Sequence, residues 1–338
     1  MLFGAGERRK LLYRRGALVD ALSGAEVAAW EPTSERIDPS EMSVTLVTRG
    51  GVVRIAEDET GVWVSDGRSR HILATGAVQL PRFNGHPHAA RLRALHHELL
   101  TNIYDGQPLP NLLVYERPWY RGAAMVAMCL ARTGNLELIA PWVQSLEEPY
   151  DRNNAGVEEP DNLGQALYLI SLVSDAEHPL VPRVLEAAAA CAQGGHLTGQ
   201  SNFAPHPVYQ TKWMKYGLSQ LALPDPYTIP RVPDSYSALI WWAYTDEHVP
   251  GPRFDQLTVA RYPYLGWAEA HFHREAPPAH PADRRPLTWE AEASQADYNA
   301  MTRVGHTYAE RRVCAPHTWH AAEMFLYLAD LSGSDRPV

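Results

Sequence analysis

Residues 122–130 have the sequence Gly-Ala-Ala-Met-Val-Ala-Met-Cys-Leu, and residues 166–173 have the sequence Ala-Leu-Tyr-Leu-Ile-Ser-Leu-Val. Neither stretch has a polar face when it is wound into a helix, so each is predicted to be a helix buried on all sides. The neighbouring segments Leu136–Leu146 and Pro179–Ala192 each carry one polar face. Buried and half-buried helices in alternation favour an α/α barrel, in which an outer ring of helices surrounds an inner ring.

Among the other predicted helices, 89–104 ends before Asp105-Gly106, and 118–132 has Pro118 in its first turn and Thr133-Gly134 at its end. Short connections between consecutive helices predict antiparallel neighbours. A two-layer helical solenoid is the alternative arrangement, but the chain shows no repeat of fixed period. These helices cover residues 89–104, 118–132, 162–174, 208–221, 234–244, 264–273, 289–303 and 316–331.

Residues 43–80 follow a different pattern, with short β-branched runs separated by turn signals such as Arg49-Gly50-Gly51 and Asp66-Gly67. The runs 43–48, 52–56, 61–65 and 71–74 predict a small antiparallel meander. A sheet of this size is expected to pack against the helices. The predicted fold is therefore all-α, with an N-terminal segment (residues 1–87) carrying the meander and a barrel domain (residues 88–338).

Composition excludes several functional classes. The chain has 338 residues, with 30 Lys and Arg against 39 Asp and Glu, and such an acidic balance disfavours nucleic-acid binding. The sequence has no apolar run long enough to predict a membrane span, and the first residues lack the apolar core of a secretion signal. Three distant cysteines predict neither a disulfide framework nor a metal site. We therefore expect a cytoplasmic protein.

Residues 116–125, with the sequence Glu-Arg-Pro-Trp-Tyr-Arg-Gly-Ala-Ala-Met, resemble an inner-helix start of the six-hairpin glycosidases, the (α/α)6-barrel superfamily. There, Trp-x-Arg-Asp is followed by small residues and Met. Residues 157–167 look like the acidic loop that leads into the next inner helix, and Pro286–Glu292 and Pro316–Glu323 stand where the last inner helices should begin. The resemblance covers roughly residues 85–331. It implies an (α/α)6 barrel and a glycosidase that acts on a small oligosaccharide or glycoside.

The chain departs from this motif at one position. Gly122 follows Arg121, where the superfamily motif has an aspartate. Hydrolysis would then depend on other acids, or the activity has changed or been lost.

Glycoside hydrolysis needs two carboxyl groups, one as proton donor and one as base or nucleophile. Glu159 is the candidate acid, and Asp161 is either a second catalytic candidate or the N-cap of a helix. Glu290 is the candidate base, favoured over Glu292, and Trp289 beside it is a candidate platform for a sugar ring.

Several further residues stand at or near the starts of inner helices and are expected to share one cavity with these acids. The spacing of His317, His320 and Glu323 by three residues predicts a fan across one helix surface. A hydrogen-bonded network that fixes the helix end is the alternative. Because the i, i+4 pair of a zinc helix is missing, no metal and no cofactor are predicted. The substrate-binding candidates are Glu116, Trp119, Arg121, Trp289, His317, Trp319, His320 and Glu323.

Two other functions compete with hydrolysis. A sugar epimerase similar to the N-acylglucosamine 2-epimerases would use paired histidines for proton transfer, with His271 and His320 as the pair. A non-catalytic barrel that binds a sugar or a partner protein fits the glycine at position 122. A small carbohydrate is the expected partner in the enzyme hypotheses, and the sequence leaves the oligomeric state open.

Overall fold

A computed structural model of the chain describes residues 1–233, 253–261 and 317–330, together with single positions between residues 244 and 275. The chain divides into two compact units. The first contains residues 1–117 and 129–139 and helix α11 (Thr318–Asp330), and the second contains residues 118–128 and 140–284. Helix α2 (Tyr120–Thr133) begins in the second unit and ends in the first.

The first unit begins with two antiparallel sheets, so the prediction of an all-α (α/α)6 barrel is wrong. Over its described residues the chain is mixed α/β, with a four-stranded and a five-stranded sheet, about eight helices and a helix content of only 38%. The first sheet contains β1 (Leu2–Phe3), β2 (Leu11–Arg14), β3 (Ala17–Asp20) and β4 (Glu26–Ala29). The second contains β5 (Pro32–Asp38), β6 (Ser43–Thr48), β7 (Gly51–Asp58), β8 (Gly61–Ser65) and β9 (Arg70–Ala74).

The predicted meander is confirmed in β6 to β9, which pair antiparallel in chain order. The structure adds β5 at its edge and a whole sheet before it. The missed sheet had a signal in the sequence. Arg15 and Gly16, with φ of 43° and 82°, form the two-residue turn between β2 and β3, and a glycine in such a turn is typical of a hairpin.

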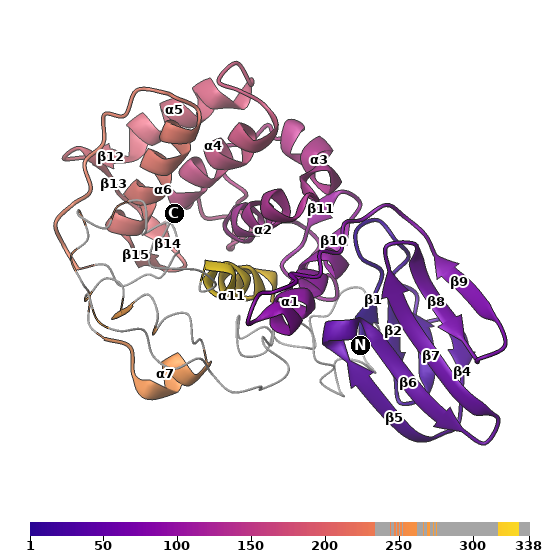
Figure 1. The fold of residues 1–338 in the computed structure, drawn as a ribbon. Helices are drawn as coiled ribbons and strands as arrows, with labels where there is room; N and C mark the ends of the chain where they lie inside the picture. Colours follow the sequence, from indigo (N-terminus) through magenta and orange to yellow (C-terminus); the bar gives the residue numbers. More distant parts are fainter. Residues whose placement is uncertain are drawn as a thin grey trace. The chain divides into compact units, whose positions relative to one another are not determined.

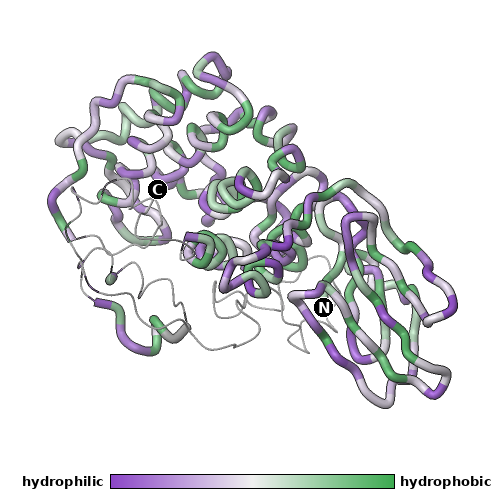
Figure 2. Tube along the Cα trace, viewed as in Figure 1, coloured by the Kyte–Doolittle hydropathy of each residue, from purple (hydrophilic) through white to green (hydrophobic). Residues whose placement is uncertain are grey.

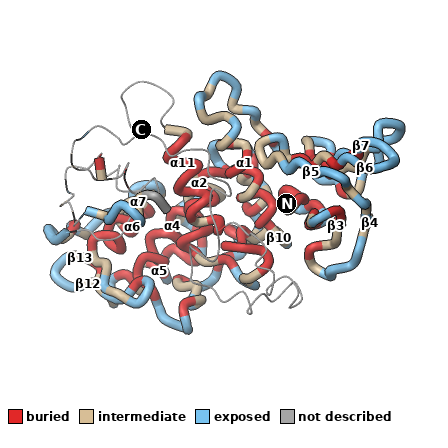
Figure 3. The backbone as a smooth tube through the Cα atoms, turned by 90° about the horizontal axis from the view of Figure 1, so that it is seen from below, coloured by how far each residue is buried: buried red, intermediate tan, exposed pale blue. Residues whose placement is uncertain are grey.

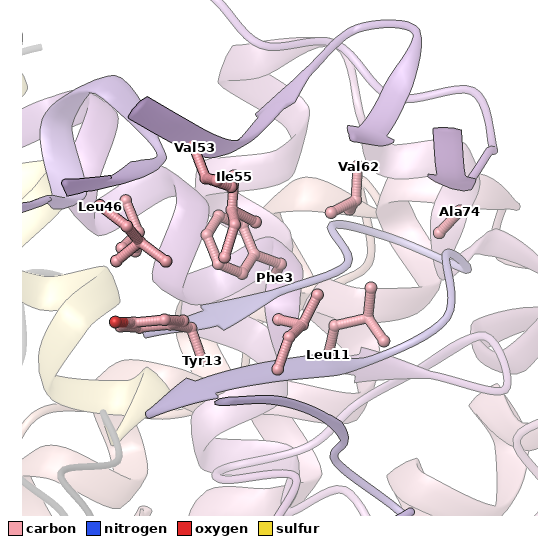
Figure 4. Close-up of a cluster of buried hydrophobic side chains, with 10 residues drawn as sticks. Phe3, Leu11, Tyr13, Leu46, Val53, Ile55, Val62 and Ala74 are labelled. Atoms are coloured by element: carbon pink, nitrogen blue, oxygen red, sulfur yellow. The ribbon is translucent and has the colours of Figure 1, made fainter. Parts of the chain in front are cut away.

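The meander packs on the first sheet, and this differs from the expected packing on helices. Figure 4 shows Phe3, Leu11 and Tyr13 of the first sheet facing Ile55 and Val62 of the second. Burial of each such side chain contributes roughly 1.5–3 kcal/mol. Figure 2 shows hydrophobic and hydrophilic residues close together along the same strands, as expected when opposite strand faces have different surroundings.

The opposite face of the first sheet is buried too. Leu12 points away from Leu11 and Tyr13, and it packs with Leu109, Leu112 and Leu113 of the segment after α1. This segment follows the short strands β10 (Ile103–Tyr104) and β11 (Gln107–Pro108).

A buried ionic cluster ties the two sheets to α1 (Ala89–Thr101). Glu57 of β7 accepts hydrogen bonds from the amides of Gly4 and Ala5, at 2.9 and 2.7 Å, and from Arg8 at 3.0 Å. His97 Nε2 of α1 lies 2.7 Å from its second carboxylate oxygen. Burial alone would raise the pKa of Glu57, but His97 and the two amides outweigh this and lower it to about 2.

The helices of the first unit include α1 and α11, which pack against each other. The Thr318 amide at the start of α11 donates to the carbonyl oxygen of Pro110 at 2.8 Å, and its hydroxyl donates to that of Leu109 at 3.0 Å. These bonds fix where α11 begins.

The second unit is mainly helical. Figure 1 shows α4 and α6 side by side, and α5 also packs on α4. Figure 3 shows that α4 is buried along most of its length, as its apolar sequence predicts. The described helices are α3 (Ala140–Gln144), α4 (Asp161–Val173), α5 (Leu180–Cys191), α6 (Pro207–Gln220) and α7 (Gln256–Arg261). Two hairpins are formed by β12 (Ala192–Gln193) with β13 (His196–Leu197) and by β14 (Gln200–Ser201) with β15 (Ala204–Pro205).

Two glycines set the close approach of α4 and α6. A Cβ added at Gly164 would lie less than 3.0 Å from the backbone of Trp213 and Met214. A Cβ at Gly217 would lie 2.8 Å from Cβ of Leu167. The two backbones therefore touch at a point where only glycine fits.

The helices predicted near residues 89, 118, 162, 179, 208 and 316 are confirmed by α1, α2, α4, α5, α6 and α11. The predicted helix 136–146 is divided into a 3₁₀ turn (Leu136–Leu138) and α3. The predicted helix 289–303 lies outside the described residues, as do most of those at 234–244 and 264–273. Within the described part of the chain, no helix combines the length and the apolar character that a membrane crossing requires.

Candidate active site

The start of α2, the loop before α4 and the hairpin β14–β15 of the second unit meet at a buried group of polar side chains. Arg121 is the centre of this group, and it is one of the sequence-predicted site residues. Its Nε lies 3.0 Å from Oδ2 of Asp161, and its second terminal nitrogen lies 3.1 Å from Oε2 of Glu159. The structure therefore brings Arg121, Glu159 and Asp161 together, and each exposes less than 5% of its side chain.

The remaining partners of both carboxylates are donors. Glu159 accepts from the Asn154 side-chain amide at 3.1 Å and from the backbone amide of Asn202. Carboxylate oxygens accept hydrogen bonds, and every described partner of the Glu159 side chain is a donor or the Arg121 guanidinium.

Asp161 is the first residue of α4, and the prediction that it caps the helix is wrong. The cap position belongs to Pro160, and the Asp161 side chain turns to other partners. It accepts from Gln165 Nε2 at 2.9 Å and from the Ser201 hydroxyl, besides Arg121. A negative charge in the first turn of α4 also suits the helix dipole.

Gln210 of α6 helps to hold the hairpin β14–β15 on this group. The Gln210 side-chain amide donates to the Gly199 carbonyl at 3.1 Å and to the Ser201 hydroxyl at 2.9 Å. A Cβ at Gly199 would lie 2.6 Å from Cγ of Pro160, so the chain passes Pro160 where only glycine fits.

Asp151 is a carboxylate of this region that the sequence reasoning missed. Its oxygens accept from the Tyr120 amide at 2.7 Å and from the Asn153 amide at 2.9 Å. Burial raises the pKa of Asp151 from 3.8 to about 6, although those amides and the Arg121 charge act to lower it. The run Asp-Arg-Asn-Asn at 151–154 was the available signal, since Asp and Asn gather where loops make local hydrogen bonds.

The loop that carries Asp151 is fastened to the start of α2. Asn153 Nδ2 donates to the Pro118 carbonyl at 2.7 Å, and the Tyr120 hydroxyl donates to the Glu148 carbonyl at 2.8 Å. Trp119, a predicted binding residue, is half-buried between these two contacts along the chain. An aromatic ring and a protonatable carboxyl are thus both placed by one short stretch of backbone.

His206 stands at the start of α6 and was not among the predicted site residues. Burial lowers its pKa, while the charge of Asp161 raises it and that of Arg121 lowers it. His206 thus lies within electrostatic range of the group, in a setting that favours the neutral imidazole.

The other predicted site residues belong to the first unit or lie outside the described residues. Glu116 is an exposed residue of the first unit, and Trp289, Glu290 and the epimerase candidate His271 lie outside the described residues.

His317, Trp319, His320 and Glu323 belong to α11 and its start in the first unit. The His317 and His320 rings are 5.2 Å apart, and Trp319 stacks on His320 at 5.0 Å. Burial, followed by the nearby His317, lowers the pKa of His320 well below its usual value. The histidine pair belongs to the first unit, and the Arg121 group belongs to the second.

Among the residues that the structure describes, no three His, Cys, Asp or Glu side chains are grouped so that they could hold a metal ion.

Comparisons of the chain with protein-family models, with curated proteins and with solved structures find no match. The function must therefore be argued from the chemistry of the site itself.

Proposed function

We propose that the protein hydrolyses a glycosidic bond, with Asp151 as the proton donor. The observation that carries this proposal is the contrast between neighbouring carboxyl groups. Asp151 has a pKa raised to about 6, whereas Glu159 and Asp161 are surrounded by donors and paired with Arg121. A carboxyl group whose pKa is raised towards neutral pH is typical of a catalytic proton donor.

In this mechanism Asp151 gives its proton to the glycosidic oxygen as the bond to the anomeric carbon breaks. A second carboxylate takes a proton from the water that adds to that carbon and later releases it to solvent, and Asp151 regains its proton from solvent. With a pKa of about 6, roughly one Asp151 side chain in ten is protonated at pH 7.

The roles of the other predicted acids change accordingly. Glu159 and Asp161 become positioning residues, which fix Arg121 and the hairpin β14–β15. Glu290 stays the predicted base. Trp119 precedes Tyr120, whose amide donates to Asp151. An aromatic residue at this position supports a carbohydrate substrate, because its ring can offer an apolar face to the C–H groups of a sugar.

Leaving-group dependence tests the role of Asp151. Methyl glycosides and dinitrophenyl glycosides of the same sugars are assayed with wild type and Asp151→Asn. Loss of the acid should lower turnover of the methyl glycosides about 10²–10⁴-fold. Turnover of the dinitrophenyl glycosides, whose leaving group needs no proton, should change little. An equal loss for both substrates would remove Asp151 as the acid.

Asp175→Asn is the matched control for this variant. Asp175 is exposed, lies in the same unit and accepts from the amide two residues ahead at 2.9 Å, as Asp151 does. It should leave both activities unchanged. Glu290→Gln should slow both substrates, since a base acts on water whatever the leaving group.

A non-catalytic sugar-binding protein is the second candidate. The observation in its favour is that Glu159 and Asp161 each have three donors around them, as in a group built for rigidity rather than for proton transfer. Binding of oligosaccharides without turnover of any substrate by wild type would support this candidate over hydrolysis. The epimerase hypothesis stays a prediction, because His271 lies outside the described residues. It predicts that wild type incorporates solvent deuterium at a sugar carbon and that His320→Asn loses this activity.

A further inference from the structure

The turn at the tip of the hairpin β14–β15 has an unfavourable backbone. Asn202 and Phe203 connect the two strands with φ of 51° and 68°. Two consecutive positive φ angles are the signature of a tight hairpin turn that favours Asn followed by Gly. Asn is tolerated in this conformation, but a residue with a bulky side chain such as Phe is an outlier.

The Phe203 side chain is not stabilised by burial in this conformation. Phe203 is 71% exposed, the second most exposed of the large hydrophobic side chains described. In the described part of the chain no aromatic ring packs against it. An exposed ring on a strained backbone gains little from burial, and an observed strain of this kind is a reason to look for function.

The turn is held in this strained conformation by its contacts with the buried carboxyl groups of Glu159 and Asp161. The Ser201 hydroxyl donates to Asp161, and the Asn202 amide donates to Glu159. On the other side Gly199 passes closely over Pro160. These contacts lie immediately before Phe203 in the chain, so the tip has little freedom to relax.

We propose that Phe203 is a substrate-binding residue, whose ring stacks on the C–H face of a neutral pyranose in an oligosaccharide. The proposal rests on the proposed function, and it explains why Glu159 and Asp161 are tied to the hairpin. The loop that supplies Glu159 to the tip also carries Asp151, the proposed acid. One loop thus positions both the proton donor and the aromatic platform.

The experiment measures binding and hydrolysis separately on the full chain. Isothermal titration with cellotriose, maltotriose, xylotriose, mannotriose and chitotriose identifies the tightest trisaccharide for wild type. Phe203→Ala should weaken binding of that trisaccharide about tenfold, a usual size for the loss of one stacking contact. Phe203→Tyr, which keeps the ring, should bind within about twofold of wild type.

Thermal unfolding separates this role from a structural one. Phe203→Asn places a residue that tolerates positive φ at the tip, so it should keep or raise the melting temperature by about 2 °C while weakening binding. Ala222→Gly is the matched control. Ala222 is an exposed residue of the same unit with φ of 53°, and its replacement should affect stability but not binding.

The outcomes distinguish the two proposals. Wild-type hydrolysis with unchanged affinity and KM in Phe203→Ala overturns the role of Phe203 and leaves the hydrolase proposal standing. Trisaccharide binding that depends on Phe203, without hydrolysis of any substrate, supports the role of Phe203 and overturns the hydrolase proposal. A change of oligomeric state in Phe203→Ala with unchanged trisaccharide affinity also overturns the role of Phe203. Absence of both binding and hydrolysis in wild type overturns both proposals.

Discussion

Nε of Arg121 lies 3.0 Å from Oδ2 of Asp161, with side-chain exposures of 4% and 0%. Glu159, two residues before Asp161 in the chain, pairs with the same guanidinium. One guanidinium therefore pairs with two buried carboxyl groups. Removing that cation would leave both carboxylates without their only described positive neighbour.

Arg121→Met should destabilise the protein by about 3–5 kcal/mol, since removal of one partner leaves buried charges uncompensated. Urea unfolding measures this. Arg183→Met is the control, because Arg183 pairs with Glu148 at 3.1 Å with about half of both side chains exposed. Its loss should cost less than about 1 kcal/mol. Equal unfolding midpoints for the two variants would contradict the buried pairing.

With Asp151 as the proton donor, the turnover rate should decrease on the alkaline side of its pH profile. Because the pKa of Asp151 is about 6, turnover of methyl glycosides should fall as pH rises through 6. Dinitrophenyl glycosides should lack this limb. A pH–rate profile without a limb near 6 for the methyl glycosides would contradict Asp151 as the donor.

The raised pKa of Asp151 also predicts how the free energy of unfolding depends on pH. The pKa of Asp151 is raised above its ordinary 3.8, so the folded state binds the proton more tightly than the unfolded state. Its contribution is greatest below about pH 4 and is lost as pH rises through 6. The unfolding free energy of wild type relative to Asp151→Asn should therefore decline between pH 4 and 6. A difference that rises with pH would refute the raised pKa.

Glu57 in the first unit predicts the opposite dependence. Its pKa is lowered to about 2 from 4.5, so its contribution to stability is present above pH 4.5 and is lost as pH falls to about 2. Glu57→Gln should cost several kcal/mol at pH 7, because Arg8 would lose its buried partner. Glu41→Gln, at a half-exposed pair with Arg93, is the control and should change little.

The contact between α4 and α6 predicts a strong steric effect. Gly164→Ala should destabilise by more than about 2 kcal/mol, because the new methyl group meets backbone rather than a flexible side chain. Gly50→Ala is the control, since only the Thr48 hydroxyl lies near, at 3.7 Å, and its φ is not in the left-handed region. Thermal unfolding of both variants checks the prediction. Similar melting temperatures would contradict the close approach.

Local patterns predicted the elements better than their assembly. The continuous apolar sequence of residues 166–173 correctly predicted a buried helix, because both helix formation and burial depend here on residues that are close in the sequence. The sheet of residues 2–29 was missed because its strands are only two to four residues long, and the all-α prediction failed with it.

The candidate site was predictable in part for a similar reason. Arg121, Glu159 and Asp161 were marked by an aromatic and acidic composition at predicted helix starts. Asp151 and Phe203 were missed, because the pKa of one and the backbone angle of the other arise from contacts between distant segments. Such contacts leave no periodic trace in the sequence.

The backbone contact between Gly164 and Gly217 has a consequence for substrate size. Two helices in backbone contact cannot shift along or towards each other without a clash, so α4 and α6 form a fixed frame. Asp161 and Gln210, which hold the hairpin, stand on this frame. Under the proposal that Phe203 stacks on a sugar ring, only rotation of its side chain is left to accommodate a larger or smaller sugar, and the range of substrates should be narrow in shape.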